Sequence, residues 1–186
     1  MLLDLYNFNL RKIYLIFLII SAIFLLLLFL TPIIIENYLI PSKNIYDNFI
    51  VFDFCDWVYS FGNLICHQRA DRSWFINGIQ MPVCVRCLGI SIGICIASVI
   101  SVLIVPKGNF IRKIKKFYFI DEKGSLIKLV VIISFFMLPL IIDGFSQIIF
   151  EYSSLEITRF ITGLLFGYFE GSLFLSILCS LIPIGE

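Results

Sequence analysis

Residues 13–35 read IYLIFLIISAIFLLLLFLTPIII, an uninterrupted run of 23 residues without a charged side chain. At 1.5 Å per residue a helix of this length is about 34 Å long, enough to cross a hydrocarbon core of roughly 30 Å. A signal peptide is the competing interpretation, but its apolar core is usually about 7 to 15 residues long and is followed by an Ala-x-Ala-like site, which is missing here. The run therefore predicts a retained transmembrane helix.

The composition of the 186-residue chain also indicates a membrane protein. Hydrophobic residues make up 60% of the chain and charged residues 15%, whereas soluble domains carry about 45 to 50% and about 25%. The formal net charge is only +1, so nothing in the overall charge favours binding to nucleic acid. We expect a single integral membrane domain over 1–186 that is surrounded by the lipid bilayer and has no nucleic-acid partner.

Three further apolar segments are long enough to cross the bilayer. The predicted fold is an all-α, polytopic transmembrane helical bundle with four spans, at about 13–35, 88–105, 129–150 and 160–182. Segment 45–66 is ambiguous, because its polar residues recur in steps of three and four and would form one stripe on a helix. This segment is expected to be an amphipathic helix at the interface or an additional span.

The distribution of lysine and arginine predicts the orientation of the bundle. The connection 106–128 contains seven of the 14 basic residues, and the positive-inside rule puts such a connection in the cytoplasm. Segment 66–87 is then extracytoplasmic whether or not 45–66 crosses the bilayer. We therefore expect a multi-pass protein of the cell membrane with its cysteine-rich segment outside.

Segment 66–87 combines residue types that bind metal ions. Cys84 and Cys87 form a C-x-x-C pair, and Cys66 and His67 stand together upstream. Two thiolates at this spacing can bind one ion, and a further thiolate with a neutral imidazole completes a tetrahedral set. The pattern predicts a structural or catalytic metal ion, zinc or alternatively iron, bound by Cys66, His67, Cys84 and Cys87. A disulfide or thiol-redox pair, and thiols without a role, are the open alternatives.

Four of the six arginines lie in or near this segment or at the predicted outer end of a span, whereas the lysines are mostly cytoplasmic. The planar guanidinium group suits bidentate binding of carboxylate or phosphate. The sequence therefore predicts an anionic lipid or small molecule at the interface. The predicted binding residues are Arg69, Arg72, Arg86, Gln147 and Arg159. Ordinary ion pairing with nearby carboxylates is the alternative.

Two carboxylates fall within the predicted spans. Asp143 shares one helix face with Gln147, and we expect it to act as a general base or to support a metal-bound His67 through a hydrogen bond. An ion pair of Asp143 with Arg86 or Arg159 is the structural alternative. Asp143 and Glu170 would instead line an ion path if the chain were a small transporter or channel.

Small residues recur every four positions in the second and fourth predicted spans, at Gly89 and Gly93 and at Gly163 and Gly167. Small residues at this spacing allow helix backbones to approach closely. The pattern predicts that these two spans pack against each other.

The motifs themselves resemble a family of small predicted membrane proteins of bacteria and archaea that is a domain of unknown function. The resemblance lies in CHQ at 66–68, PVCVRCLG at 82–89, the Asp143, Gly144 and Gln147 pattern, and the Arg159, Thr162 and Gly163 pattern, so it covers roughly 64–171. It implies that the signature positions are Cys66, His67, Cys84, Cys87, Asp143, Gln147 and Arg159. The family usually has Asn at the position of Glu156, and Glu170 matches no family position. The resemblance supplies no activity.

Overall fold

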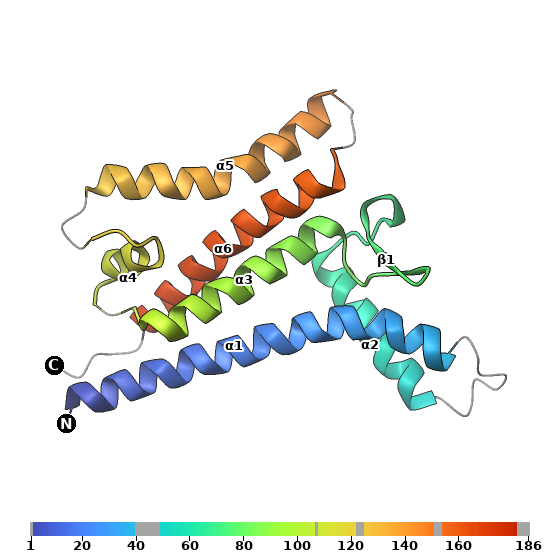
Figure 1. The fold of residues 1–186 in the computed structure, drawn as a ribbon, viewed down its shortest axis with the longest axis horizontal. Helices are drawn as coiled ribbons and strands as arrows, with labels where there is room; N and C mark the ends of the chain where they lie inside the picture. Colours follow the sequence, from blue (N-terminus) through green and yellow to red (C-terminus); the bar gives the residue numbers. More distant parts are fainter. Residues whose placement is uncertain (1, 40–48, 107, 122–124, 151–153, 182–186) are drawn as a thin grey trace.

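The computed structural model describes residues 2–39, 49–106, 108–121, 125–150 and 154–181 of the chain. These residues are mostly helical, with one short hairpin before the third helix (Figure 1). The helices are α1 (Leu2–Ile34), α2 (Phe49–Ile65), α3 (Val85–Ile104), α4 (Phe110–Phe117), α5 (Leu126–Phe150) and α6 (Glu156–Ser180). The other elements are the π-helical turn η1 (Ile35–Leu39), the short turn η3 (Ala70–Arg72), and the strands β1 (Phe75–Ile76) and β2 (Ile79–Gln80).

Four helices are long and apolar enough to cross a membrane, which confirms the predicted all-α bundle of four spans. They cover Leu10–Asn37, Val85–Ile104, Leu126–Phe150 and Glu156–Ser180. Two of them begin before the predicted 88 and 160, because their first turns contain Arg86 and Arg159, charged residues that a hydropathy pattern leaves out. α3 and α6 lie side by side in the middle of the bundle, with α1 on one flank and α5 on the other (Figure 1).

α2 does not run along the bundle with these four helices. It lies across α1 near one end of the bundle (Figure 1) and is helical over Phe49–Ile65. It is not among the four candidate spans in the part of the chain that the structure describes. Residues 45–48 of the ambiguous segment lie outside the described residues, so both interpretations of that segment stay predictions.

Glycines allow α3 and α6 to touch backbone to backbone. A Cβ atom added to Gly93 would lie 2.3 Å from the backbone oxygen of Leu164, and one added to Gly167 would lie 2.1 Å from that of Ile90. Neither contact leaves room for a side chain. The predicted contact between the second and fourth spans is confirmed.

One end of the bundle, which we call the basic end, is closed by α4. This helix was not predicted from the sequence, in which the connection 106–128 stands out only by its basic residues. α4 is tied to the bundle by the Tyr168 hydroxyl, which donates to the backbone oxygen of Phe117, and by a 3.1 Å hydrogen bond between Tyr118 and Ser172. Lys113 is almost fully buried there, and its ammonium group lies 3.3 Å from the Ser180 hydroxyl. Part of the positive charge of the connection 106–128 is therefore buried and does not lie on the surface.

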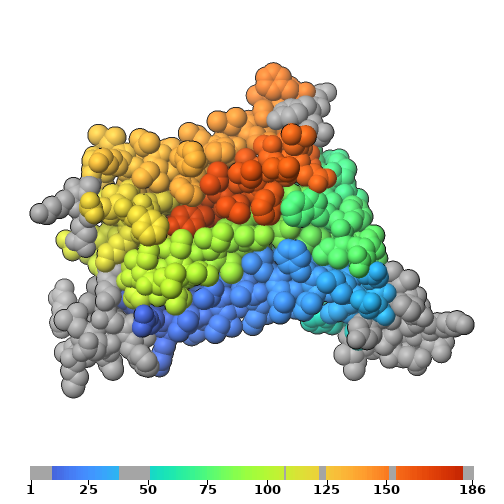
Figure 2. All heavy atoms as spheres, in the orientation of Figure 1, coloured from blue at the N-terminus to red at the C-terminus, as the bar shows by residue number. Residues whose placement is uncertain are grey.

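The opposite end, which we call the motif end, carries residues 66–87. β1 and β2 form an antiparallel hairpin whose turn residues Asn77 and Gly78 have φ values of 50° and 84°, the left-handed conformations that a tight two-residue turn requires. The segment folds over the starts of α3 and α6 as a cap (Figure 2). Its small core consists of Leu28, Cys66, Met81, Val83, Cys84 and Leu88. Two of these six buried residues are cysteines.

Candidate metal centre and arginine network

The structure brings three of the four predicted metal ligands together. Cys66 directly follows α2, Cys84 is the last residue before α3, and Cys87 lies in the first turn of α3. Their sulfur atoms all lie within 4.8 Å of one another. In a tetrahedral site with metal–sulfur bonds of about 2.3 Å the sulfurs are roughly 3.8 Å apart, so a small contraction of this cluster would fit one ion. All six cysteines of the chain are free thiols in the structure.

Backbone groups hold the Cys66 sulfur in this position. It accepts hydrogen bonds from the N–H of Cys84 at 3.1 Å and from the N–H of Gln68 at 3.4 Å. Hydrogen bonds from the Cys84 and Cys87 thiols, together with those backbone donors, hold the pKa of the Cys66 thiol below its ordinary value. The thiolate form, which is the one that binds metals, is thus the form that these surroundings favour.

Gln68 is a structural residue of this site that the sequence interpretation did not assign. Its side-chain nitrogen donates to the backbone oxygens of Tyr59 at 2.6 Å and Pro82 at 2.7 Å. Its own backbone oxygen accepts a hydrogen bond from the side chain of Gln80 at 2.7 Å. Gln68 therefore joins α2, the hairpin and the segment before α3. Its place directly after Cys66 and His67, in the CHQ motif, was the available signal.

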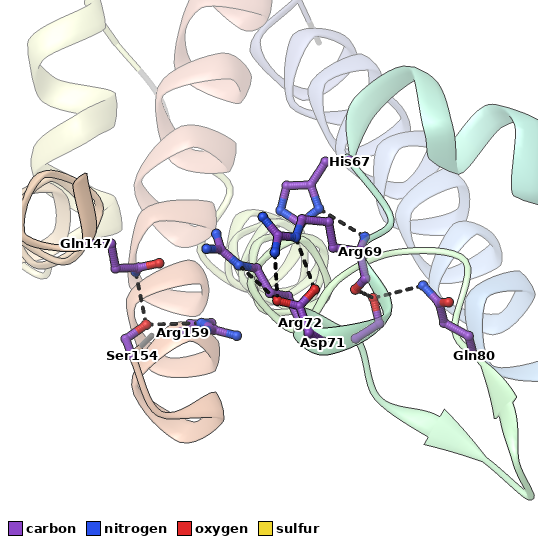
Figure 3. A network of polar contacts seen from close by, with 9 residues as sticks. His67, Arg69, Asp71, Arg72, Gln80, Gln147, Ser154 and Arg159 are labelled. Atoms are coloured by element: carbon purple, nitrogen blue, oxygen red, sulfur yellow. Dashed lines mark hydrogen bonds and ion pairs between the residues drawn. The ribbon is translucent and has the colours of Figure 1, made fainter. Parts of the chain in front are cut away.

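His67, the fourth predicted ligand, does not join the three sulfurs. Its ring is exposed, and Nδ1 accepts a 3.1 Å hydrogen bond from the backbone N–H of Arg69 (Figure 3). His67 is adjacent to Cys66 in the chain, which keeps its ring near the cluster, but the geometry does not include it in the cluster.

Asp143 lies on the other side of the α3 start, away from the cysteines, and is 5% exposed. Its Oδ2 pairs with the guanidinium group of Arg86 and accepts a 2.8 Å hydrogen bond from the amide of Gln147. Its Oδ1 is buried without a hydrogen-bond partner among the described residues. Three predicted site residues therefore meet here. The ion pair that was the structural alternative for Asp143 is present.

Arg159 is connected to the same group through Ser154, which the sequence interpretation missed. Arg159 is 4% exposed, and its Nε donates to the Ser154 hydroxyl at 3.0 Å. The Gln147 amide donates to the same hydroxyl at 3.0 Å (Figure 3). A chain of polar contacts thus runs from α6 through Ser154 to α5 and on to Arg86. The available signal was that Ser154 also matches the family resemblance, in the stretch that leads to Arg159, although no role was predicted for it.

Arg69 and Arg72 flank a single carboxylate on η3. Arg69 binds Asp71 with two hydrogen bonds of 3.0 Å, whereas the Nε of Arg72 lies 3.9 Å from the same carboxylate (Figure 3). This Nε is buried and has no hydrogen-bond partner among the described residues. The ordinary ion pairing that was the alternative for the arginines is therefore present for both, at 3.0 Å for Arg69 and only at 3.9 Å for Arg72.

The two membrane carboxylates have different surroundings. Glu170 lines a mostly apolar cavity of about 500 Å³ between α1, α2, α3 and α6, which Cys87 also lines. A second cavity, of about 430 Å³, is lined by Arg72, Arg86 and Gln147, and the last two of these contact the buried Asp143. The transporter interpretation, with Asp143 and Glu170 along one path, stays a prediction.

A family model described as "Predicted membrane protein (DUF2085)" matches residues 66–173 of the chain. An uncharacterized protein of Methanocaldococcus jannaschii, MJ1492, is 36% identical to the chain over 158 residues, which are 85% of this chain and 87% of that protein. The chain belongs to the DUF2085 family. An uncharacterized protein of Methanothermobacter thermautotrophicus is 31% identical over 100 residues, 54% of this chain and 75% of that protein. No solved structure matches the chain.

The predicted resemblance to a family of small membrane proteins is thereby confirmed. In this DUF2085 protein the matched region begins at Cys66 and contains the sulfur cluster and all four arginines of the motif end. α1 and α2 lie outside the matched region, yet α1 contributes Leu28 to the small core around the cysteines. The sulfur cluster and the arginine network meet at the first turn of α3. Arg86 and Cys87 are neighbours there in sequence, but Arg86 pairs with Asp143 of α5, whereas the Cys87 thiol contacts the backbone oxygen of Ile65 in α2.

Proposed function

We propose that this DUF2085 protein is an integral membrane protein that binds one thiophilic metal ion through Cys66, Cys84 and Cys87. The observation that carries the proposal is the convergence of three sulfurs from two helix ends within 4.8 Å. Thiolate-rich tetrahedral sites are typical of zinc, the first candidate, and of iron, the second. His67 stays the predicted fourth ligand.

The ion would act as a clamp at the motif end. Cys66 and Cys84 are buried in the core of a segment that otherwise contains only two-residue strands and one short turn. A buried thiolate set with four ligands is typical of structural metal sites. Since Arg86 stands between Cys84 and Cys87, the ion would also fix the turn that carries the Arg86–Asp143 pair.

Metal analysis of detergent-purified protein tests this proposal. The wild type is expected to retain close to one equivalent of zinc or iron, and the Cys84→Ser, Cys87→Ser double variant is expected to lose it. Cys95→Ser is the matched control, because Cys95 lies on α3 outside the sulfur cluster. Absence of metal from the wild type, with thiols that alkylation shows to cycle between reduced and oxidised forms, would favour a membrane thiol-redox protein instead.

A His67→Ala variant separates two forms of the metal site. A loss of affinity of at least about tenfold would identify His67 as the fourth ligand, which requires the exposed ring to turn toward the cluster. Unchanged affinity would assign the fourth position to water or to an added ligand, as in catalytic zinc sites.

Asp143 is proposed to support the site through Arg86 rather than to bind the metal. Its carboxylate contacts Arg86 and Gln147, so Asp143→Asn is expected to leave the metal content unchanged. Any activity that depends on Asp143 as a general base would be lost in this variant while the metal stays bound.

A second candidate function, recognition of an anionic molecule at the bilayer interface, is supported by the arginines of the motif end. Among the described residues, three of these four arginines form ion pairs, with Asp71 or Asp143, and Arg159 forms none. Arg72 and Arg86 line one cavity together with Gln147. Radiolabelled phosphate or a soluble organophosphate that fails to bind would count against this candidate.

We also propose that the motif end faces the extracytoplasmic side. The support is the concentration of lysine at the opposite, basic end, because cytoplasmic connections are rich in Lys and Arg. A cysteine introduced at Asn77, on the exposed hairpin turn, into a chain that keeps its native cysteines should add a site that reacts with a membrane-impermeant maleimide in intact cells, compared with the wild type. A cysteine introduced at exposed Arg112 should react only after lysis.

A further inference from the structure

The cavity beside Asp143 has two unlike walls. One wall is polar and consists of Arg72 from η3, Arg86 from the first turn of α3, and Gln147 from α5. The other wall is apolar and belongs to α5, where Phe145 and Ile148 are 63% and 76% exposed. Because α5 is one of the four candidate spans, this apolar wall continues a surface that would face lipid chains.

The polar wall presents guanidinium donors that the described residues leave unused. The Nε atoms of both Arg72 and Arg86 are buried and have no hydrogen-bond partner there. Arg86 is engaged by Asp143 through its terminal nitrogen only, and Arg72 has only a distant carboxylate at 3.9 Å. Two guanidinium groups from different elements at one cavity match an anion with several oxygens, for which phosphate is the usual partner of arginine in proteins.

The remaining contacts hold this polar wall in place without neutralising it. Gln147 is fixed by Asp143 at 2.8 Å and by Ser154 at 3.0 Å, and Ser154 in turn binds the buried Arg159. Arg159 thus adds a buried positive charge without an ion-pair partner among the described residues. An anionic ligand would offset this charge.

We infer that the cavity between η3, the start of α3 and α5 binds the phosphate group of an anionic membrane lipid, with its hydrocarbon part along Phe145 and Ile148 of α5. This inference rests on the second candidate function, anion recognition, and not on the metal ion. A volume of about 430 Å³ is in the range of small-molecule sites and suits a headgroup with the beginning of its chains. A soluble phosphate ester has the same phosphate group and could contact the same arginines. The apolar wall favours a lipid, because only a lipid has hydrocarbon chains that would lie along it.

Arg69 and Arg72 form a matched pair for the test. Both flank Asp71, and both would lose one positive charge on replacement by glutamine, but only Arg72 lines the cavity. Wild type, Arg69→Gln and Arg72→Gln would be purified in neutral detergent and titrated with phosphatidic acid, with phosphatidylcholine and with glycerol 3-phosphate. Binding would be followed by native mass spectrometry, and metal content would be measured in the same samples.

The inference expects phosphatidic acid adducts on the wild type and on Arg69→Gln, weakened at least tenfold by Arg72→Gln at unchanged metal content. A Phe145→Glu variant, which puts a negative charge on the apolar wall, should weaken the lipid and spare glycerol 3-phosphate. Equal loss in both arginine variants, or equal binding of phosphatidylcholine, would overturn the inference. Binding of glycerol 3-phosphate without the lipid would overturn the lipid assignment and retain anion recognition. Binding of neither would overturn anion recognition as well.

Discussion

The two ends of the bundle are closed by different chemistry. At the basic end, α4 is held by an apolar and aromatic core that includes Phe117, Tyr118 and Tyr168, and by tyrosine hydroxyls that satisfy backbone and serine oxygens. At the motif end, the short strands offer little to bury, and the small core contains the Cys66 and Cys84 sulfurs. Side-chain packing therefore closes the basic end, whereas at the motif end the proposed metal ion would supply a cross-link that the small core does not.

The largest loss of stability is expected from a substitution in the contact between α3 and α6, because these two helices support both ends of the bundle. Replacing Gly167 by Ile would push a side chain into the α3 backbone, 2.1 Å from the Ile90 oxygen, and should cost at least about 3 kcal/mol or prevent folding. Thermal unfolding in detergent and size-exclusion chromatography would measure this. The control is Gly144→Ala, where an added Cβ meets nothing within 4 Å; its stability should stay the same or rise slightly, since Ala favours helix over Gly. Tolerance of Gly167→Ile would refute the close α3–α6 contact.

The next effect should be confined to the motif end. Removal of the metal by a chelator, or Cys84→Ser with Cys87→Ser, is expected to speed hydrogen exchange across residues 66–87 and to leave α4 unchanged. The physical reason is that metal binding free energy contributes to folding where the ligands are otherwise held by little buried surface. Equal loosening of both ends would show that the ends are not independent. Cys95→Ser should behave as wild type.

A smaller effect at the basic end completes the comparison. Tyr168→Phe removes the hydroxyl that donates to the Phe117 oxygen, which leaves a buried acceptor unpaired and should cost about 1 to 3 kcal/mol. Hydrogen exchange should increase in α4 and not in residues 66–87, and the metal content should not change. Phe136→Leu is the control for a loss of packing alone, because Phe136 packs against the Tyr168 ring. This variant should destabilise the basic end without leaving a backbone oxygen unpaired.

The smallest effect concerns Lys113. Burial lowers the pKa of its ammonium group, so protonation favours the unfolded state. The stability of the protein should therefore rise as pH increases from the lowered pKa toward the ordinary value of about 10.4. Lys113→Met should remove this slope and raise the melting temperature at neutral pH by less than about 4 °C. A lower melting temperature would mean that the contact with Ser180 outweighs the cost of burial.

The comparison of the two ends also explains what the sequence could predict. The four spans follow from long apolar runs, each of a length that is typical of transmembrane helices, and the Cys84–Cys87 spacing is local, so both could be predicted directly from the sequence. Cys66 could also be assigned to that pair, because only the connection between α2 and α3 has to bring it there. α4 was missed because its lysines were interpreted by their charge, although the burial of Lys113 and Phe117 depends on contacts with α6.

The roles of Gln68 and Ser154 could not be predicted, although both positions lie in the region of the family resemblance. These roles arise from hydrogen bonds of the folded chain, which Gln68 donates to the Pro82 backbone oxygen and Arg159 donates to the Ser154 hydroxyl. The hairpin was a different case. Asn77-Gly78 is a strong turn signal, but only two residues pair on each side of it, too few for a period-two pattern.

The most direct test of the metal centre is X-ray absorption spectroscopy of the purified protein at the edge of the metal that it contains. The expected spectrum shows three sulfur ligands at about 2.3 Å and one nitrogen or oxygen ligand at about 2.0 to 2.1 Å. Loss of the sulfur shell in the Cys84→Ser, Cys87→Ser variant would complete the assignment. A metal coordinated only by nitrogen and oxygen, or a wild type whose three cysteines carry a disulfide and no metal, would contradict it.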